Sequence, residues 1–224
     1  MQRDPGEHPS PQLVARLTRL ALAAPNRAGS TRLVAVDGPS GAGKTTLADA
    51  LALELGAPVV HMDDLYPGWD GLRESRLRVQ DWVVAPLRAG RPPRYRRWDW
   101  ARSEYGAWVE PEPSPVVVLE GCGSGALDTA DALSLLVWVE AEEAVRRRRG
   151  LRRDPGYKDF WDRWGRQERE VYAADRTRAR ADVVVDTTPP GATTGHDAAD
   201  GLGRHTRRMA TEAQADDRVR DPAE

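Results

Sequence analysis

Short apolar runs rich in β-branched residues recur along the chain, separated by stretches with helical spacing. Four of these runs are clear: Arg32–Asp37, Val116–Glu120, Leu135–Glu140 and Asp182–Asp186. A fifth and weaker run is Pro58–His61. Runs that are apolar on both faces and alternate with helices are typical of a parallel sheet covered on both sides. The pattern predicts an α/β fold, a three-layer doubly wound parallel sheet of about five strands.

Apolar residues at helical spacing predict an amphipathic helix before the first strand. They are Leu13, Val14, Leu17, Leu20, Ala21 and Ala24. Intervals of three and four residues place them on one face of a helix. A second helix is expected over Thr45–Leu55, directly after the first strand. Dense proline in residues 86–115 predicts instead a long irregular insertion with three embedded tryptophans.

Composition divides the chain into one folded stretch and two polar ends. Residues 1–10 are rich in proline and charge, and residues 189–224 contain almost no large apolar side chain. Such segments cannot bury enough apolar surface to fold by themselves. We therefore expect a single domain over residues 11–188, with a disordered N-terminus over residues 1–10 and a disordered tail over residues 189–224.

Charge and cysteine content exclude several classes of function. The net charge of −2 provides no broad positive field for nucleic acid. Cys122 is the only cysteine, which excludes internal disulfides and a cysteine-cluster metal site. No run of about 18 apolar residues could span a membrane, and arginines interrupt the apolar stretch near the N-terminus. We expect a cytoplasmic protein without a nucleic-acid or membrane partner; the sequence does not indicate its oligomeric state.

Residues 38–45 read G-P-S-G-A-G-K-T and match the phosphate-loop pattern G-x-x-x-x-G-K-[ST]. A predicted strand precedes the loop and a predicted helix follows it. Glycines let backbone N–H groups converge on phosphate oxygens, and the helix N-terminus adds a partial positive charge. A chance glycine-rich turn is the alternative. The residues expected to bind nucleotide are Gly38, Ser40, Gly41, Ala42, Gly43, Lys44, Thr45 and Thr46.

Two residues of this loop have more specific expected roles. Lys44 would reach the β- and γ-phosphates of ATP, and the Thr45 hydroxyl would bind Mg²⁺. Lysine occurs at only two positions, Lys44 and Lys158, among 33 basic residues, which indicates that a compact ammonium is required here. We therefore expect ATP and Mg²⁺ as cofactors.

Other nucleotide-binding classes have signatures that this chain lacks. The guanine-reading N-K-x-D sequence is missing, and so is the L-S-G-G sequence of transporter ATPases. The stretch after the core has no apolar pattern for the helical lid domain of ring ATPases. A small-molecule kinase fits best.

Acidic residues follow two predicted strands, at the sheet edge where doubly wound folds bind ligands. Asp63 and Asp64 come after the run that ends at residue 61, and Glu120 ends a later run. Asp63 is the candidate base for an attacking hydroxyl, with helix capping as the alternative for both aspartates, and the sequence alone does not decide whether Asp63 or Glu120 is the base. Glu120 is the candidate for holding Mg²⁺ or touching substrate, unless it is an ordinary acid at a strand end.

An arginine-rich segment, residues 146–153, follows the fourth strand run. On a helix, Arg149 and Arg153 share a face at i,i+4 spacing. Their guanidinium groups could close over ATP phosphates as a lid and stabilise transition-state charge. A solvated basic face is the alternative.

These motifs resemble the uridine kinase-like branch of P-loop kinases, whose relatives include phosphoribulokinase and pantothenate kinase. The likeness spans residues 30–188 and rests on the phosphate loop, on D-D-L-Y at 63–66 and on the arginine segment that ends in R-D at 153–154. It implies a P-loop NTPase fold of the kinase type with a lid. It also implies that Asp63 is the catalytic base, that Tyr66 lines the acceptor pocket, and that Arg149 and Arg153 bind phosphates.

The segment Trp98-Asp99-Trp100 is similar to the Y-D-F segment of this family, which implies that Trp98 and Asp99 contact the substrate. The His and Arg that follow it in uridine kinases have no counterpart in residues 101–104. We expect an ATP-dependent phosphotransferase with an alcohol acceptor, first of all a nucleoside such as uridine or cytidine. A sugar, a glycerate-like acid or a pantothenate-like alcohol is the alternative acceptor. A regulatory protein that binds ATP through its P-loop is the alternative function.

Overall fold

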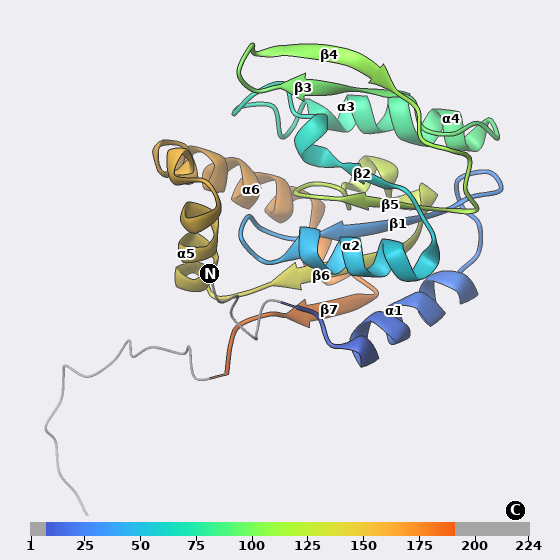
Figure 1. Ribbon diagram of the computed structural model, residues 1–224, viewed down its shortest axis with the longest axis horizontal. Helices are drawn as coiled ribbons and strands as arrows, with labels where there is room; N and C mark the ends of the chain where they lie inside the picture. Colours follow the sequence, from blue (N-terminus) through green and yellow to red (C-terminus); the bar gives the residue numbers. More distant parts are fainter. Residues whose placement is uncertain (1–7, 191–224) are drawn as a thin grey trace, which may run out of the picture. The chain divides into compact units, whose positions relative to one another are not determined.

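The computed structural model describes residues 8–190, which form an α/β fold around a five-stranded sheet (Figure 1). The strands are β1 (Arg32–Asp37), β2 (Val59–His61), β5 (Val116–Glu120), β6 (Leu133–Glu140) and β7 (Val183–Asp186). All neighbours pair in parallel, in the order β2-β5-β1-β6-β7. The predicted fold class is confirmed, and each strand begins or ends within two residues of its predicted bounds.

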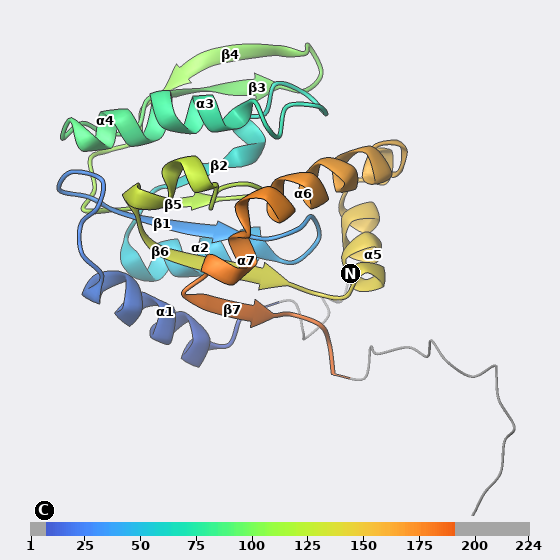
Figure 2. The same ribbon diagram turned by 180° about the vertical axis from the view of Figure 1, so that it is seen from behind.

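Helices cover both faces of the sheet because its strands are apolar on both sides. On one face, Val34 and Val36 of β1 pack with α1 (Pro11–Ala23) and α2 (Lys44–Leu55) in one core cluster. On the other face, which Figure 2 presents, Leu33 and Ala35 belong to a second cluster together with residues of α6 (Trp161–Asp175). The alternation along β1 therefore supplies both cores.

The prediction of an irregular insertion over residues 86–115 is wrong. The chain forms α3 (Ser75–Val79), the π-helical η2 (Gln80–Val84) and α4 (Ala85–Arg88), then the antiparallel strands β3 (Tyr95–Asp99) and β4 (Glu104–Val109). The prolines lie at the ends of these elements, where they are tolerated: Pro86 occupies the first turn of α4, and others lie before β3 and after β4. The hairpin lies beyond the β2 edge of the sheet (Figures 1 and 2).

The remaining elements are short, apart from one helix at the carboxyl end of the sheet. They are η1 (Met62–Asp64), η3 (Leu127–Ala132), α5 (Glu143–Arg153), η4 (Pro155–Asp159) and α7 (Thr177–Arg180). Within residues 8–190, no helix is long and apolar enough to cross a membrane. The predicted disorder at both ends falls mostly on residues outside the described range.

Candidate active site

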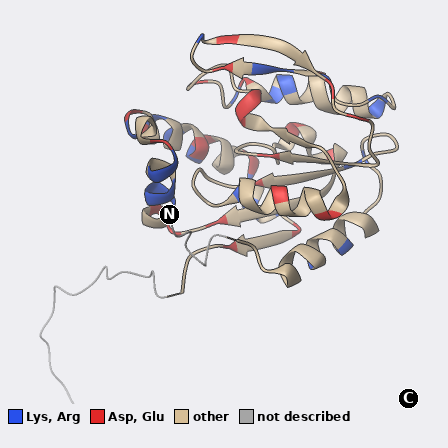
Figure 3. Cartoon of the chain, in the orientation of Figure 1, with Lys and Arg blue, Asp and Glu red and all other residues tan. Residues whose placement is uncertain are grey.

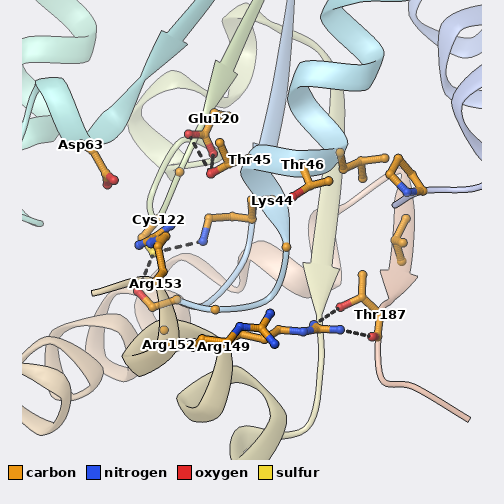
Figure 4. A pocket seen from close by; sticks show the side chains of 18 of the residues that line it. Lys44, Thr45, Thr46, Asp63, Glu120, Cys122, Arg149, Arg152, Arg153 and Thr187 are labelled. Carbon is orange, nitrogen blue, oxygen red and sulfur yellow. Dashed lines mark hydrogen bonds between the residues drawn. The ribbon is translucent and has the colours of Figure 1, made fainter. Parts of the chain in front are cut away.

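A pocket of about 1200 Å³ lies at the carboxyl edge of the sheet, above the loop between β1 and α2 (Figure 4). Loops after β1, β2 and β5 and the helix α5 all contribute to its wall. The lining residues of the predicted site are Ser40, Gly41, Gly43, Lys44, Thr45, Thr46, Asp63, Tyr66, Glu120, Arg149 and Arg153. The parallel sheet thus brings together side chains that are far apart in sequence, at the edge expected for this topology.

Glycines shape the phosphate loop because its backbone adopts conformations that other residues avoid. The φ angles of Gly38, Gly41 and Gly43 are 144°, 78° and 95°. A Cβ atom on Gly38 would lie 1.9 Å from the Val139 carbonyl oxygen, and one on Gly41 would lie 2.2 Å from that of Arg146. Glycine is therefore required at both positions by close approach as well as by backbone angle.

Lys44 is buried beneath this loop. Its Nζ donates to the Pro39 carbonyl oxygen at 3.1 Å and lies 3.4 Å from the Cys122 Sγ. Burial alone would lower the pKa of Lys44, but the nearby acids Glu168 and Glu120 outweigh that effect and raise it. Burial raises the pKa of the Cys122 thiol to about 12, which fits a packed neutral group rather than a nucleophile. Lys44 therefore stays charged where phosphate would bind.

Thr45 and Glu120 form an oxygen-rich corner of the pocket. The Thr45 hydroxyl lies 3.3 Å from each Glu120 carboxylate oxygen, and His61 Nδ1 lies 2.8 Å from Glu120 Oε1. The hydrogen bond between His61 and Glu120 raises the pKa of His61. A hydroxyl beside a carboxylate suits Mg²⁺, which prefers oxygen ligands and keeps positions for water and phosphate. The described chain has no cluster of three or more metal-binding His, Cys, Asp or Glu side chains, so nucleotide phosphates would have to complete the ligand set.

Asp63 stands at the start of η1, and its side chain is open to the pocket (Figure 4). Its carboxylate has no hydrogen-bond or ion-pair partner between residues 8 and 190. Asp63 is exposed to the pocket, but partial loss of water around its carboxylate raises its pKa, and Glu120 raises it further, whereas Arg153 and Lys44 lower it. Asp63 is therefore a free carboxylate of raised basicity.

The neighbouring aspartate, Asp64, forms an ion pair outside the pocket wall. The Asp64 carboxylate pairs with the guanidinium of Arg97 on β3 at 3.2 Å. Neither aspartate makes a side-chain capping hydrogen bond to η1. The two adjacent aspartates therefore differ in their surroundings: Asp64 is held in an ion pair, whereas Asp63 has none within residues 8–190.

The arginine-rich segment is the helix α5, which stands at the carboxyl end of the sheet and carries a concentration of basic residues (Figure 3). Arg149, Arg152 and Arg153 line the pocket, so this side of the helix faces the site as expected. Arg149 donates through both terminal nitrogens to Thr187, to the hydroxyl and the carbonyl oxygen, at 2.9 Å each.

Two of the predicted substrate residues lie away from the pocket. Trp98 packs edge-on against Tyr105 within the hairpin, with ring centroids 4.9 Å apart. The Asp99 carboxylate accepts hydrogen bonds from the backbone N–H groups of Ala101 and Arg102, at 3.0 Å each, and so stabilises the hairpin turn. Neither lines the pocket.

An aromatic wall that the sequence does not reveal covers the Asp63 side of the pocket. Tyr66, whose hydroxyl donates to the Cys122 carbonyl oxygen at 2.8 Å, lines the pocket as expected. Trp69, Trp100 and Tyr157 line it as well, and Trp69 lies between the other two with centroid distances of 4.8 and 5.3 Å. The Trp100 indole N–H donates to the Asp63 carbonyl oxygen at 3.2 Å.

Glu168 is the functional candidate that sequence reasoning misses most clearly. It is 4% exposed, and its Oε1 accepts a hydrogen bond from the Ser40 N–H at 2.8 Å. One signal points to it: the buried face of α6 is formed by Trp161, Trp164, Glu168, Val171 and Asp175. An acid within such an apolar stripe at helical spacing indicates a buried polar contact.

No protein-family model and no curated protein matches the chain. Among solved structures, a possible uridine kinase from Bacillus stearothermophilus is 21% identical with a TM-score of 0.59, and the match covers 78% of this chain and 98% of that chain. A protein provisionally named a fructose transport system kinase, from Silicibacter sp., is 24% identical with a TM-score of 0.49. That match covers 76% of this chain and 98% of the other chain. A shikimate kinase from Bacteroides thetaiotaomicron is 18% identical with a TM-score of 0.41, and the match covers 70% of this chain and 86% of the other chain. The first of these likenesses shows that the fold is shared.

Proposed function

We propose that this protein is an ATP-dependent small-molecule kinase, which transfers the γ-phosphoryl group of ATP to the hydroxyl of an acceptor. The observation that carries the proposal is the free Asp63 carboxylate, which faces the same pocket as Lys44 of the phosphate loop. A P-loop that only bound nucleotide would not require an unpaired acid on the far side of the phosphate site. A kinase requires one to orient the attacking hydroxyl.

The reaction follows from the positions of these groups. The phosphate loop binds the β- and γ-phosphates, and Lys44 with Arg149 and Arg153 offsets their charge. The acceptor oxygen forms a bond to the γ-phosphorus as the bond to the β-phosphate oxygen breaks. Asp63 takes the hydroxyl proton, and ADP leaves. Thr45 and Glu120 are the residues that would hold Mg²⁺, which would supply charge neutralisation on the phosphates.

The raised pKa of Asp63 suits this role. A base is most effective when its pKa approaches the working pH, provided that it is still ionised there. Enclosure in the pocket and the nearby Glu120 both move the pKa of Asp63 in this direction. Arg153 and Lys44 limit the shift, so the carboxylate remains available as a base.

We propose a nucleoside such as uridine or cytidine as the acceptor. Support comes from Trp100, an exposed ring of the pocket wall that lies beside the Asp63 backbone, since a planar base can pack on such a ring. The likeness in fold to a possible uridine kinase agrees with this choice. A glycerate-like acid or a pantothenate-like alcohol has no ring to pack on Trp100, whereas a sugar ring remains the alternative that the acceptor screen must separate.

The test is a screen of ADP release from Mg²⁺-ATP with nucleosides, sugars, hydroxy acids and pantothenate as acceptors. We expect uridine or cytidine to accelerate release, and Asp63→Asn to lower turnover by about 10²-fold or more while ATP affinity is retained. Asp64→Asn is the matched control, because its carboxylate pairs with Arg97, and it should change turnover far less. If only a non-nucleoside accelerated ADP release, the acceptor would belong to that other class. If no compound in the panel accelerated ADP release, the result would favour a regulatory protein that binds ATP.

A further inference from the structure

Ser40, near the tip of the phosphate loop, has each of its polar groups bound by a different side chain. Its N–H donates to Glu168 Oε1 at 2.8 Å, its carbonyl oxygen accepts from Arg146 Nη1 at 3.1 Å, and its hydroxyl accepts from the Tyr157 hydroxyl at 2.9 Å. These partners belong to α6, α5 and η4, three successive elements of one segment. We call these three hydrogen bonds the Ser40 contacts.

The backbone of the same segment also touches the loop. An added Cβ on Gly41 would lie 2.2 Å from the carbonyl oxygen and 2.9 Å from the Cα of Arg146. The first turn of α5 therefore lies against the phosphate loop with no room for a side chain between them. A helix docked in this way is held to the loop at one end, whereas a lid that closes over ATP would have to move freely.

Glu168 is the most constrained of the three partners. It is 4% exposed, and its Oε1 also accepts a hydrogen bond from the Cys122 thiol, with Sγ at 3.1 Å. A buried carboxylate is costly unless it is hydrogen-bonded and balanced by positive charge. The nearby Lys44, whose electrostatic partners include Glu168, supplies that balance.

We propose that Glu168 and Tyr157 are positioning residues, which hold the phosphate loop in its binding conformation through the Ser40 contacts. The proposal deepens the kinase function and rests on it for the consequence at ATP. The Ser40 N–H is directed to Glu168, behind the loop, and the loop cannot relax without breaking contacts to three elements. A loop already held in place loses less conformational freedom when phosphate binds.

The same contacts link the loop to the arginines of the pocket. Arg146 lies on α5, one turn before Arg149, and Tyr157 follows α5 directly. The distance from Lys44 to the pocket arginines is therefore set before nucleotide arrives. Preorganised charge of this kind is what phosphoryl transfer requires.

The first experiment measures hydrogen exchange of residues 38–43 in the nucleotide-free protein by mass spectrometry, relative to exchange of the β1 strand. We expect exchange of this loop to be slow in the wild type and faster by about threefold to tenfold in Tyr157→Phe, which removes one hydrogen bond and keeps the ring. Glu168→Ala should accelerate it more. Asp175→Asn is the matched control, because Asp175 is equally buried on α6 but binds Arg76 and the Leu127 N–H.

The second experiment measures Mg²⁺-ATP affinity in a double-mutant cycle of Tyr157→Phe and Ser40→Ala. Each single change should raise the Kd for ATP by about threefold to tenfold, and the double change should raise it by less than the product of the two effects. Both changes remove the hydrogen bond between Tyr157 and Ser40, and Ser40→Ala also removes the contact of the Ser40 hydroxyl with the Cys122 Sγ at 3.6 Å. A merely structural role would lower the melting temperature and leave the Kd for ATP as in the wild type.

The outcomes separate this proposal from the kinase function. If no acceptor accelerates ADP release, the kinase function fails, whereas loop exchange in the free protein still decides whether the Ser40 contacts hold the loop. Exchange that is equally fast in the wild type and in Tyr157→Phe would overturn the proposal. So would an equal acceleration in Asp175→Asn, or ATP affinities that fall additively in the cycle.

Discussion

Asp63 is the residue whose behaviour depends most on its neighbours. Its carboxylate lacks a partner within the described residues, and its pKa is raised by enclosure and by Glu120 but lowered by Arg153. As a base, Asp63 must be ionised, so activity is present above its pKa and is lost as the pH falls through that value. If Asp63 is the base, as proposed, the acid limb of the activity profile should report the pKa of Asp63.

This leads to a signed prediction for Arg153. Arg153→Gln removes the positive charge that lowers the pKa of Asp63, so that pKa should rise and the acid limb of kcat/KM should move to higher pH. Turnover should also fall, because one cation is lost near the phosphates. Arg148→Gln, on the same helix but outside the pocket wall, is the control and should leave the limb in place. A limb that moved to lower pH would contradict the assignment of Asp63 as the base.

At the residue scale, the sequence identifies those pocket residues that lie in the phosphate-loop motif or at the end of a predicted strand. Lys44, Thr45 and Glu120 follow or end predicted strands and meet in the pocket. The sequence does not decide whether Asp63 or Glu120 is the base. It also does not reveal that Asp64 pairs with Arg97, which lies on a hairpin in the proline-rich segment. Contacts between distant segments are absent from local patterns.

Among the elements, the hairpin of β3 and β4 has a role that its exposed position does not suggest. Trp100, at its turn, donates to the carbonyl oxygen of Asp63, and the Tyr105 hydroxyl on β4 donates to that of Leu65 at 2.8 Å. Both hydrogen bonds hold the backbone around the proposed base. The hairpin therefore positions Asp63 through main-chain contacts.

We expect Trp100→Phe to raise the KM for the acceptor by about threefold to tenfold, because it removes one hydrogen bond to the Asp63 backbone and keeps an aromatic ring. The Kd for ATP should not change. Trp108→Phe is the matched control, since this exposed tryptophan packs against Trp82 and Arg94, away from the pocket. Equal effects of the two changes on steady-state kinetics would show that the hairpin acts only through stability.

Docking of α5 on the phosphate loop supports a second prediction at this scale. Gly41→Ala introduces a methyl group that would lie 2.2 Å from the Arg146 carbonyl oxygen, so α5 or the loop must shift. Gly90→Ala has a similar φ, 71° against 78°, but nothing lies within 4 Å of the added Cβ. Both changes should lower the free energy of unfolding by about 1–2 kcal/mol through backbone strain.

Only Gly41→Ala should weaken ATP binding, by about tenfold or more, because roughly 1.4 kcal/mol of misfit already corresponds to that factor. Chemical denaturation gives the stability of both variants, and calorimetric titration with Mg²⁺-ATP gives the affinity. Normal affinity in Gly41→Ala would mean that α5 moves away from the loop at little cost.

For the molecule as a whole, binding at the carboxyl edge should stabilise the entire fold, because the pocket wall draws on loops after β1, β2 and β5 and on α5. At a concentration of about 100 Kd, a ligand adds roughly 2.7 kcal/mol to the free energy of unfolding. For a domain of this size, that corresponds to a rise in melting temperature of about 5–10 °C. Mg²⁺-ATP should produce this rise in a thermal melt, and AMP, which lacks the phosphates that the loop binds, should produce far less. Equal shifts for both would place binding elsewhere.

By itself the sequence determines the five strands of the parallel sheet, the helices α1 and α2 and the phosphate loop, because each depends on periodicity or spacing within about 20 residues or fewer. The order of the strands, the pairing of Asp64 with Arg97 and the contact of Ser40 with Glu168 are decided only by the tertiary structure. Ser40 and Glu168 are 128 residues apart, and what joins them is the packing of α6 on the face of the sheet behind the loop. The residues of the phosphate loop are thus adjacent in the sequence, whereas the residues that hold the loop and complete the pocket come from segments that only folding brings together.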